Sequence, residues 1–108
     1  MTKVDEEKRR AILGLLGLAQ RAGKLRLGSG PVLRALRDDG PGVVLLARDA
    51  GKDLAGKIDR ERGRSLVDRT LFDADELASA FGRDKLSVVS VHEAGFVSGL
   101  VRHLSEPR

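Results

Sequence analysis

Apolar residues recur at three- and four-residue spacings near the start of the chain. Ile12, Leu15, Leu16 and Ala19 follow this pattern, which predicts an amphipathic helix over residues 11–22 with a stop at Gly23. Two glycines inside this segment, Gly14 and Gly17, each weaken a helix by about 1 kcal/mol relative to alanine. We therefore expect them to allow close approach to a neighbouring sheet.

Short strand patterns and longer helix patterns alternate along the rest of the chain. Strands are predicted over residues 24–27, 43–47, 65–69 and 86–91. Helices are predicted over residues 31–39, 52–62 and 95–104, and Asp73 with Glu76 predicts a capping box that starts another. This alternation predicts an α/β fold in which helices cover both faces of a sheet of about four strands.

The length of 108 residues fits one domain over residues 1–108, with frayed ends at 1–8 and 105–108. There is no cysteine, so disulfides and thiolate metal sites are excluded. No apolar run approaches the roughly 20 residues that span a bilayer, and the charged start lacks an export signal. We expect a cytoplasmic, monomeric protein that does not contact membranes.

Charged residues make up 33% of the chain, and 20 basic against 16 acidic residues give a formal net charge of +4. This surplus permits a polyanionic partner. Tryptophan and tyrosine are absent and only three phenylalanines occur, so a stacking platform for single strands is poorly supplied. Charge and shape must carry any RNA recognition.

A glycine-bearing turn, Gly28, Ser29 and Gly30, leads into the helix that we expect to begin at Pro31. Such a turn presents free N–H groups and the positive end of the helix dipole to a phosphate. In the alternative reading, the glycines and the proline only shape the helix start and Ser29 caps it. A nucleotide phosphate loop is excluded because no Gly-Lys-Ser/Thr ending follows.

Basic residues surround this turn. Lys24 and Arg26 lie at alternate strand positions and share one face, while Arg34 and Arg37 lie one helical turn apart. No acidic residue occurs between positions 21 and 37. Beyond them, Arg48 precedes a segment of mixed charge and is the best further candidate for an RNA contact.

The order of segments resembles a known family. Residues 13–25, Leu-Gly-Leu-Leu-Gly-Leu-Ala-Gln-Arg-Ala-Gly-Lys-Leu, followed by Gly28, are similar to the opening of the bacterial YlxQ-like proteins, a branch of the kink-turn RNA-binding ribosomal-protein family (the L-seven-Ae and L-thirty-e superfamily). Residues 43–50, 57–58, 82–84 and 93–96 extend the resemblance over residues 12–104. It implies a three-layer α/β/α sandwich with a small, roughly four-stranded mixed sheet.

The resemblance also implies recognition of sharply bent RNA by the turn before the second helix. The family motif there is Asn-Glu, two variable residues and Lys; the matching positions are Gly30, Pro31 and Arg34. Arg34 keeps the cation, but the two base-reading side chains are missing. In the family, a second RNA-facing loop places small atoms against an extruded nucleotide, and Ala94 and Gly95 match it.

These observations predict a non-enzymatic RNA-binding protein without cofactor or metal. Its expected partners are kink-turn, ribosomal or non-coding RNA and other ribonucleoprotein components. The alternative is a protein-interaction or ribosome-associated assembly module with the same fold and degenerate RNA specificity. A fragment of an RNA methyltransferase is a third possibility, which the lack of a cofactor-holding domain makes remote.

Overall fold

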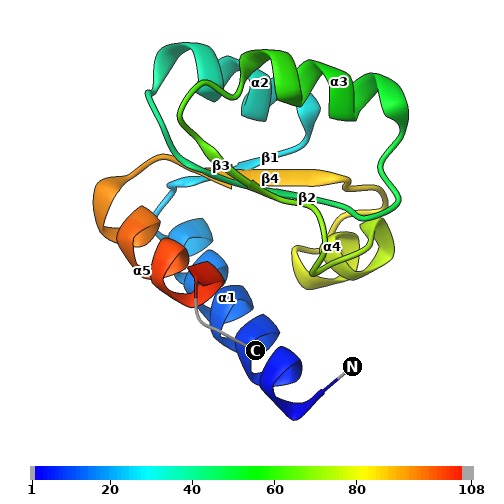
Figure 1. Cartoon of the computed structure of the whole chain (residues 1–108), viewed down its shortest axis with the longest axis vertical. Helices are drawn as coiled ribbons and strands as arrows, with labels where there is room; N and C mark the ends of the chain where they lie inside the picture. The colour runs from blue at the N-terminus through cyan, green and yellow to red at the C-terminus, as the bar shows by residue number, and fades with distance from the viewer. Residues whose placement is uncertain (1, 106–108) are drawn as a thin grey trace.

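The computed structural model describes residues 2–105, in which helices and strands alternate along the chain (Figure 1). In chain order the elements are α1 (Lys3–Arg21), β1 (Leu25–Leu27), α2 (Ser29–Asp38), β2 (Val43–Leu46), α3 (Lys52–Glu61), β3 (Leu66–Asp68), α4 (Ala74–Ala80), β4 (Val88–Val91) and α5 (Ala94–Ser105). Among these helices, none combines the length and the apolar character needed to cross a bilayer.

The four strands form one mixed sheet in the order β1-β4-β2-β3. Strand β4 runs antiparallel to both of its neighbours, whereas β2 and β3 are parallel. Helices α2 and α3 cover one face, and α1 and α5 cover the other, with α4 beside the sheet on that side (Figure 1). The expected three-layer α/β/α sandwich with a four-stranded mixed sheet is confirmed.

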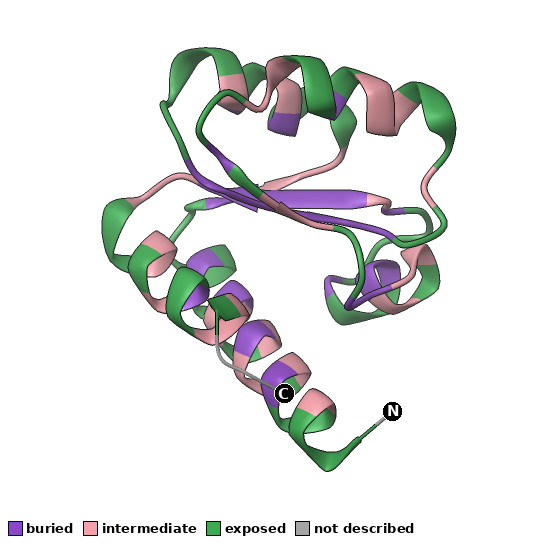
Figure 2. Cartoon of the chain, viewed as in Figure 1, coloured by how far each residue is buried: buried purple, intermediate pink, exposed green. Residues whose placement is uncertain are grey.

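Alternating side chains of the central strands supply two apolar cores, because successive residues of a strand point to opposite faces. Val44 and Leu46 pack with Val32 of α2 and Ile58 of α3. The larger core, on the other face, combines residues from α1, α4, α5 and the strands: Ile12, Leu16, Ala19, Val43, Leu45, Leu77, Val89, Val91 and Leu100. The central strands β2 and β4 are accordingly buried along their whole length, whereas the outer strands β1 and β3 are mostly half-buried (Figure 2).

Helix α1 begins much earlier than its apolar pattern predicts. Thr2 and Asp5 form a capping box, so the helix starts at Lys3 and the predicted start at Ala11 was wrong. The early turns are also held by Lys8, which is 8% exposed and donates to the carbonyl of Leu104 in α5 at 3.4 Å. Residues 3–8, expected to fray, are therefore helical. Ser105 ends α5; residues 1 and 106–108 lie outside the described part.

Gly14 and Gly17 do not approach the sheet, which corrects the expectation for them. A Cβ added at either position meets no heavy atom within 4 Å outside the helix's own backbone. The reason is helical periodicity: Ile12, Leu16 and Ala19 turn toward the sheet and place the two glycines on the other side of α1. Gly14 is exposed.

The predicted capping box of α4 is confirmed, and two arginines extend it. The Asp73 side chain accepts from the backbone N–H of Glu76, and Glu76 accepts from that of Asp73. Arg9 of α1 forms an ion pair with Glu76 and lies over the ring of Phe72, 5.0 Å from its centroid. Arg48 reaches the same two carboxylates at 3.3–3.4 Å, so this cluster fastens α4 to the body of the protein.

Candidate functional site

The register of the sheet decides which loops share an end of the molecule. The Gly28 N–H donates to the carbonyl of Val88 at 2.9 Å, and the Ala47 N–H donates to the carbonyl of Ser87 at 2.8 Å. The start of α2, the β2–α3 loop and the residues before β4 therefore meet at one end of the sheet. The β4–α5 loop lies at the other end, because Val91 pairs with Leu25 at the beginning of β1.

The start of α2 is open. Gly28 occupies the N-cap with φ +93°, a conformation that favours glycine, and no side chain caps the helix. The helix begins at Ser29, so the predicted start at Pro31 was wrong, and Ser29 is not the cap that the alternative reading made it. Pro31 has no N–H to offer, which leaves the N–H groups of Ser29 and Gly30 for a ligand or solvent. No acidic residue lies in this first turn.

A shallow groove of about 260 Å³ opens beside this helix start, and we call it the entrance groove. It is lined by Gly28, Ser29, Leu54, Lys85, Leu86 and Ser87. Lys85 is exposed and makes no hydrogen bond or ion pair within residues 2–105. Sequence reasoning missed this lysine, since only the pairing of β1 with β4 brings it to the α2 start.

Helix α3 begins at the same end of the sheet. Its N-cap is Gly51, again without a side-chain hydrogen bond. Unlike α2, it carries a carboxylate in its first turn, Asp53, beside the cation of Lys52. The α2 start is thus the more favourable of the two for an anion.

The arginines of α2 differ in their surroundings. Arg34 is exposed and has no hydrogen bond or ion pair within the described residues. Arg37 pairs with Glu61 of α3 at 3.2 Å, an exposed contact of small energetic weight. Of the two cations predicted on this helix, Arg34 is therefore the one that is available to a ligand.

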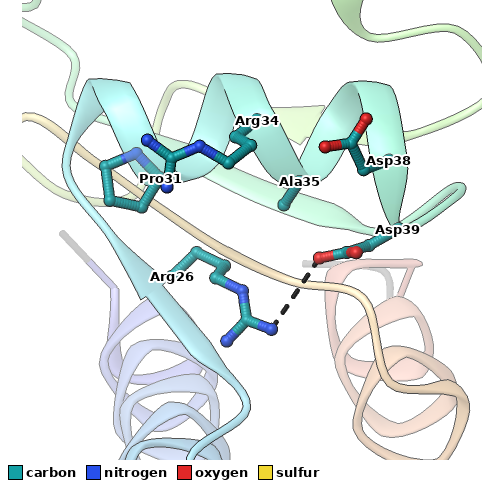
Figure 3. Close-up of a pocket in the computed structure, with 6 residues that line it drawn as sticks. All are labelled: Arg26, Pro31, Arg34, Ala35, Asp38 and Asp39. Atoms are coloured by element: carbon teal, nitrogen blue, oxygen red, sulfur yellow. Dashed lines mark ion pairs between the residues drawn. The ribbon is translucent and has the colours of Figure 1, made fainter.

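Arg26 and Arg34 line a second hollow of about 220 Å³, which we call the side groove (Figure 3). Pro31 and Ala35 contribute apolar surface, and Asp38 and Asp39 line its other end. The Arg26 guanidinium lies 3.7 Å from Asp39 and also donates to the carbonyl of Gly23 at 3.3 Å. This surface carries two cations and two carboxylates.

Lys24, expected among the basic residues around the α2 start, lies at the other end of the sheet, as do Ala94 and Gly95 of the second loop. Lys24 lines a third hollow of about 190 Å³ that also includes Asp39 and Glu93. The Glu93 carboxylate accepts the N–H groups of Gly95 and Phe96 and so caps α5. The Gly95 N–H is used within the protein, at the end of the sheet remote from Gly28.

Arg48 also departs from its predicted role. Besides its two carboxylate partners, it donates to the carbonyl of Leu71 at 3.1 Å. The neighbouring Asp49 accepts the N–H of Ala74 at 2.9 Å. These bonds hold the start of α4, so the Arg48 guanidinium is engaged within the protein by two carboxylates and a carbonyl.

His92 joins β4 to the loop before β2. Its Nδ1 lies 2.9 Å from the carbonyl oxygen of Gly40, and its Nε2 lies 2.9 Å from the hydroxyl of Ser90. A carbonyl only accepts, so Nδ1 is the donor in the first bond. Ser90 is fully buried, so this pair is structural. Within residues 2–105, no group of three or more His, Asp or Glu side chains is placed to hold a metal ion.

The fold defines a small α/β/α protein in which the start of α2 has no side-chain cap and no acidic residue in its first turn. The chain matches no family model and no curated protein. It is similar to a solved structure of a protein with unknown function from Bacillus halodurans C, with 31% identity and a TM-score of 0.77 over 88% of this chain and 97% of that one. The chain belongs to the same family as that protein.

Proposed function

We propose that this protein binds structured RNA without catalysing a reaction, and that the phosphate backbone sits at the start of α2. The target is a kinked RNA, ribosomal or non-coding, in the cytoplasm of a bacterium. The resemblance of residues 12–104 to the kink-turn-binding family supports the class of ligand.

The observation that carries the proposal is the open start of α2. Its uncapped N–H groups, the absence of acid in its first turn and the exposed Lys85 beside it create a positive local field. Arg34 adds a cation one turn along the helix. Phosphate oxygens accept from such donors, and these contacts fix the position of a nucleic acid without reading its sequence.

Gly30 and Pro31 stand where the family has Asn and Glu, so base recognition at this turn is weak. The backbone nevertheless has room for larger side chains, because a Cβ at Gly30 meets nothing within 4 Å and its φ is not positive. We expect the double variant Gly30→Asn, Pro31→Glu to prefer a kink-turn over a plain duplex more strongly than the wild-type protein does.

The proposal is tested by fluorescence anisotropy with a kink-turn RNA and a matched RNA whose G·A pairs are replaced by Watson–Crick pairs. Affinity should fall between about 50 and 200 mM salt, by about 0.9 log units per log unit of salt for each neutralised phosphate. Lys85→Ala should lower that slope by about one, and Arg34→Ala should lower it by at most one.

Arg102→Ala is the matched control, since Arg102 is an exposed cation in the last turn of α5. This variant should keep the wild-type slope. Absence of binding to either RNA at low salt, or equal losses in all three variants, would refute the assignment of the α2 start.

A second candidate function is a protein-interaction or ribosome-assembly module, favoured by the missing base-reading groups at Gly30 and Pro31. It predicts a stable protein partner that survives nuclease treatment of a cell extract. Equal recovery of that partner by wild type and by Arg34→Ala would favour this alternative over RNA binding.

A further inference from the structure

The side groove is unlike the entrance groove in its charge. Two guanidinium groups, Arg26 and Arg34, face it together with two carboxylates, Asp38 and Asp39 (Figure 3). A bare phosphate is repelled by the carboxylates, and a cationic side chain is repelled by the guanidinium groups. A ligand that suits this groove presents a π-face to a cation and hydrogen-bond donors to a carboxylate.

The polar groups of the groove remain available for such a ligand. At 3.7 Å, the Arg26–Asp39 contact is an ion pair but too long for a hydrogen bond, so both Asp39 oxygens keep their lone pairs. The side chains of Asp38 and Arg34 make no hydrogen bond or ion pair within residues 2–105. The apolar surface of Pro31 and Ala35 lies between the charged groups.

A nucleobase has these properties, and guanine fits them best. Bases in unpaired RNA stack on guanidinium planes and are read along their Watson–Crick edges. Guanine presents two adjacent donors there, N1–H and N2–H, which match the two oxygens of one carboxylate. Adenine and cytosine present a donor beside an acceptor, and uracil has acceptors on both sides of its single donor.

We propose that the side groove binds one unpaired guanine nucleotide, with Asp39 accepting from N1–H and N2–H and Arg34 stacking on the base. Arg26 lies 3.7 Å from Asp39 and offsets the negative charge of that carboxylate. The inference rests on the proposed RNA binding and adds a base preference to it. That preference comes from the C-terminal end of α2, about two turns from Gly30 and Pro31.

The test is a titration of the isotope-labelled protein with GMP, AMP, CMP and UMP, followed by amide chemical shifts. GMP should shift residues 26 and 34–39 at about tenfold lower concentration than the other three. Inosine monophosphate lacks the N2 amino group, so the concentration at which it shifts these residues should lie between those of GMP and AMP. Asp39→Asn should abolish the preference for GMP. Glu7→Gln is the control that removes the same charge from an exposed position on α1, and it should retain that preference.

A parallel titration with an RNA that carries one unpaired guanine, or adenine at the same place, separates the possible ligands. Loss of the guanine preference in Asp39→Asn, with overall RNA affinity kept or raised, supports the inference. RNA binding without any guanine preference overturns it while the proposed function stands. GMP binding without RNA binding assigns the groove to a free nucleotide and refutes the proposed function. If all four nucleotides shift the same residues at the same concentration, the side groove does not select guanine and the inference is refuted.

Discussion

Two pairs of helix starts in this protein are built in opposite ways. Thr2 and Asp73 close the starts of α1 and α4 with capping boxes. Gly28 and Gly51 stand at the starts of α2 and α3 and supply no side-chain cap. Both open starts lie at one end of the sheet. A capped helix start pairs its own backbone N–H groups and so adds to stability. An uncapped start leaves those N–H groups available to a ligand or to solvent.

The largest effect is expected from removing the carboxylate at the centre of the closed α4 corner. Glu76 accepts from Arg9, from Arg48 and from the Asp73 N–H. Glu76→Ala removes the carboxylate that pairs with the mostly buried Arg9 guanidinium and should lower the free energy of unfolding by about 2–3 kcal/mol. Urea denaturation measures this. RNA affinity of the folded variant should not change; a stability loss below about 0.5 kcal/mol would contradict the role given to Glu76.

Removing only the cap of α4 should cost less. Asp73→Ala deletes the acceptor for the Glu76 N–H and should lower the free energy of unfolding by about 1 kcal/mol. Asp73→Asn is the matched control, because asparagine also caps helices and should recover most of the loss. Equal losses in the two variants would mean that charge, not capping, holds this corner.

Closing the open α2 start should stabilise the protein and harm binding. Gly30→Asp places a carboxylate in the first turn, which should raise the free energy of unfolding by about 0.3–1 kcal/mol. The same charge should repel phosphate and weaken RNA binding. Gly30→Ala, which adds no charge, should keep the affinity; if both variants bind equally well, RNA does not approach the α2 start.

The smallest effect is expected at α3. Gly51 has extended backbone angles, φ −66° and ψ 158°, and a Cβ there meets nothing within 4 Å. Gly51→Ser should therefore add a cap and raise stability by a few tenths of a kcal/mol. Thermal unfolding detects such a change through the midpoint. A decrease would show that the backbone at Gly51 does not tolerate a side chain.

The sequence predicted most of the fold because local patterns carry it. The spacing of Asp73 and Glu76 predicts the start of α4. The apolar runs that end before Ala47 and before His92 predict the buried strands β2 and β4. The early turns of α1 were missed because their residues are charged and show no apolar stripe. Lys8 nevertheless buries its side chain against the fold.

The candidate site was harder to predict because it depends on strand register. Arg48 finds its carboxylates 25 and 28 residues further along, a separation with no local signal. Lys85 reaches the α2 start, and Ala94 is kept from it, only because β4 lies antiparallel to β1. The sequence predicted the glycine-bearing turn at residues 28–30, but it did not predict that Lys85 lies beside it.

The outer strands of the sheet, β1 and β3, are three residues each. An exposed edge strand can pair with a strand of a second copy through its unpaired backbone N–H and C=O groups. The strength of this pairing grows with the number of such groups. Edges this short offer too few groups for a continuous intermolecular sheet. We therefore expect that a high concentration of the protein would not by itself drive it into fibrils.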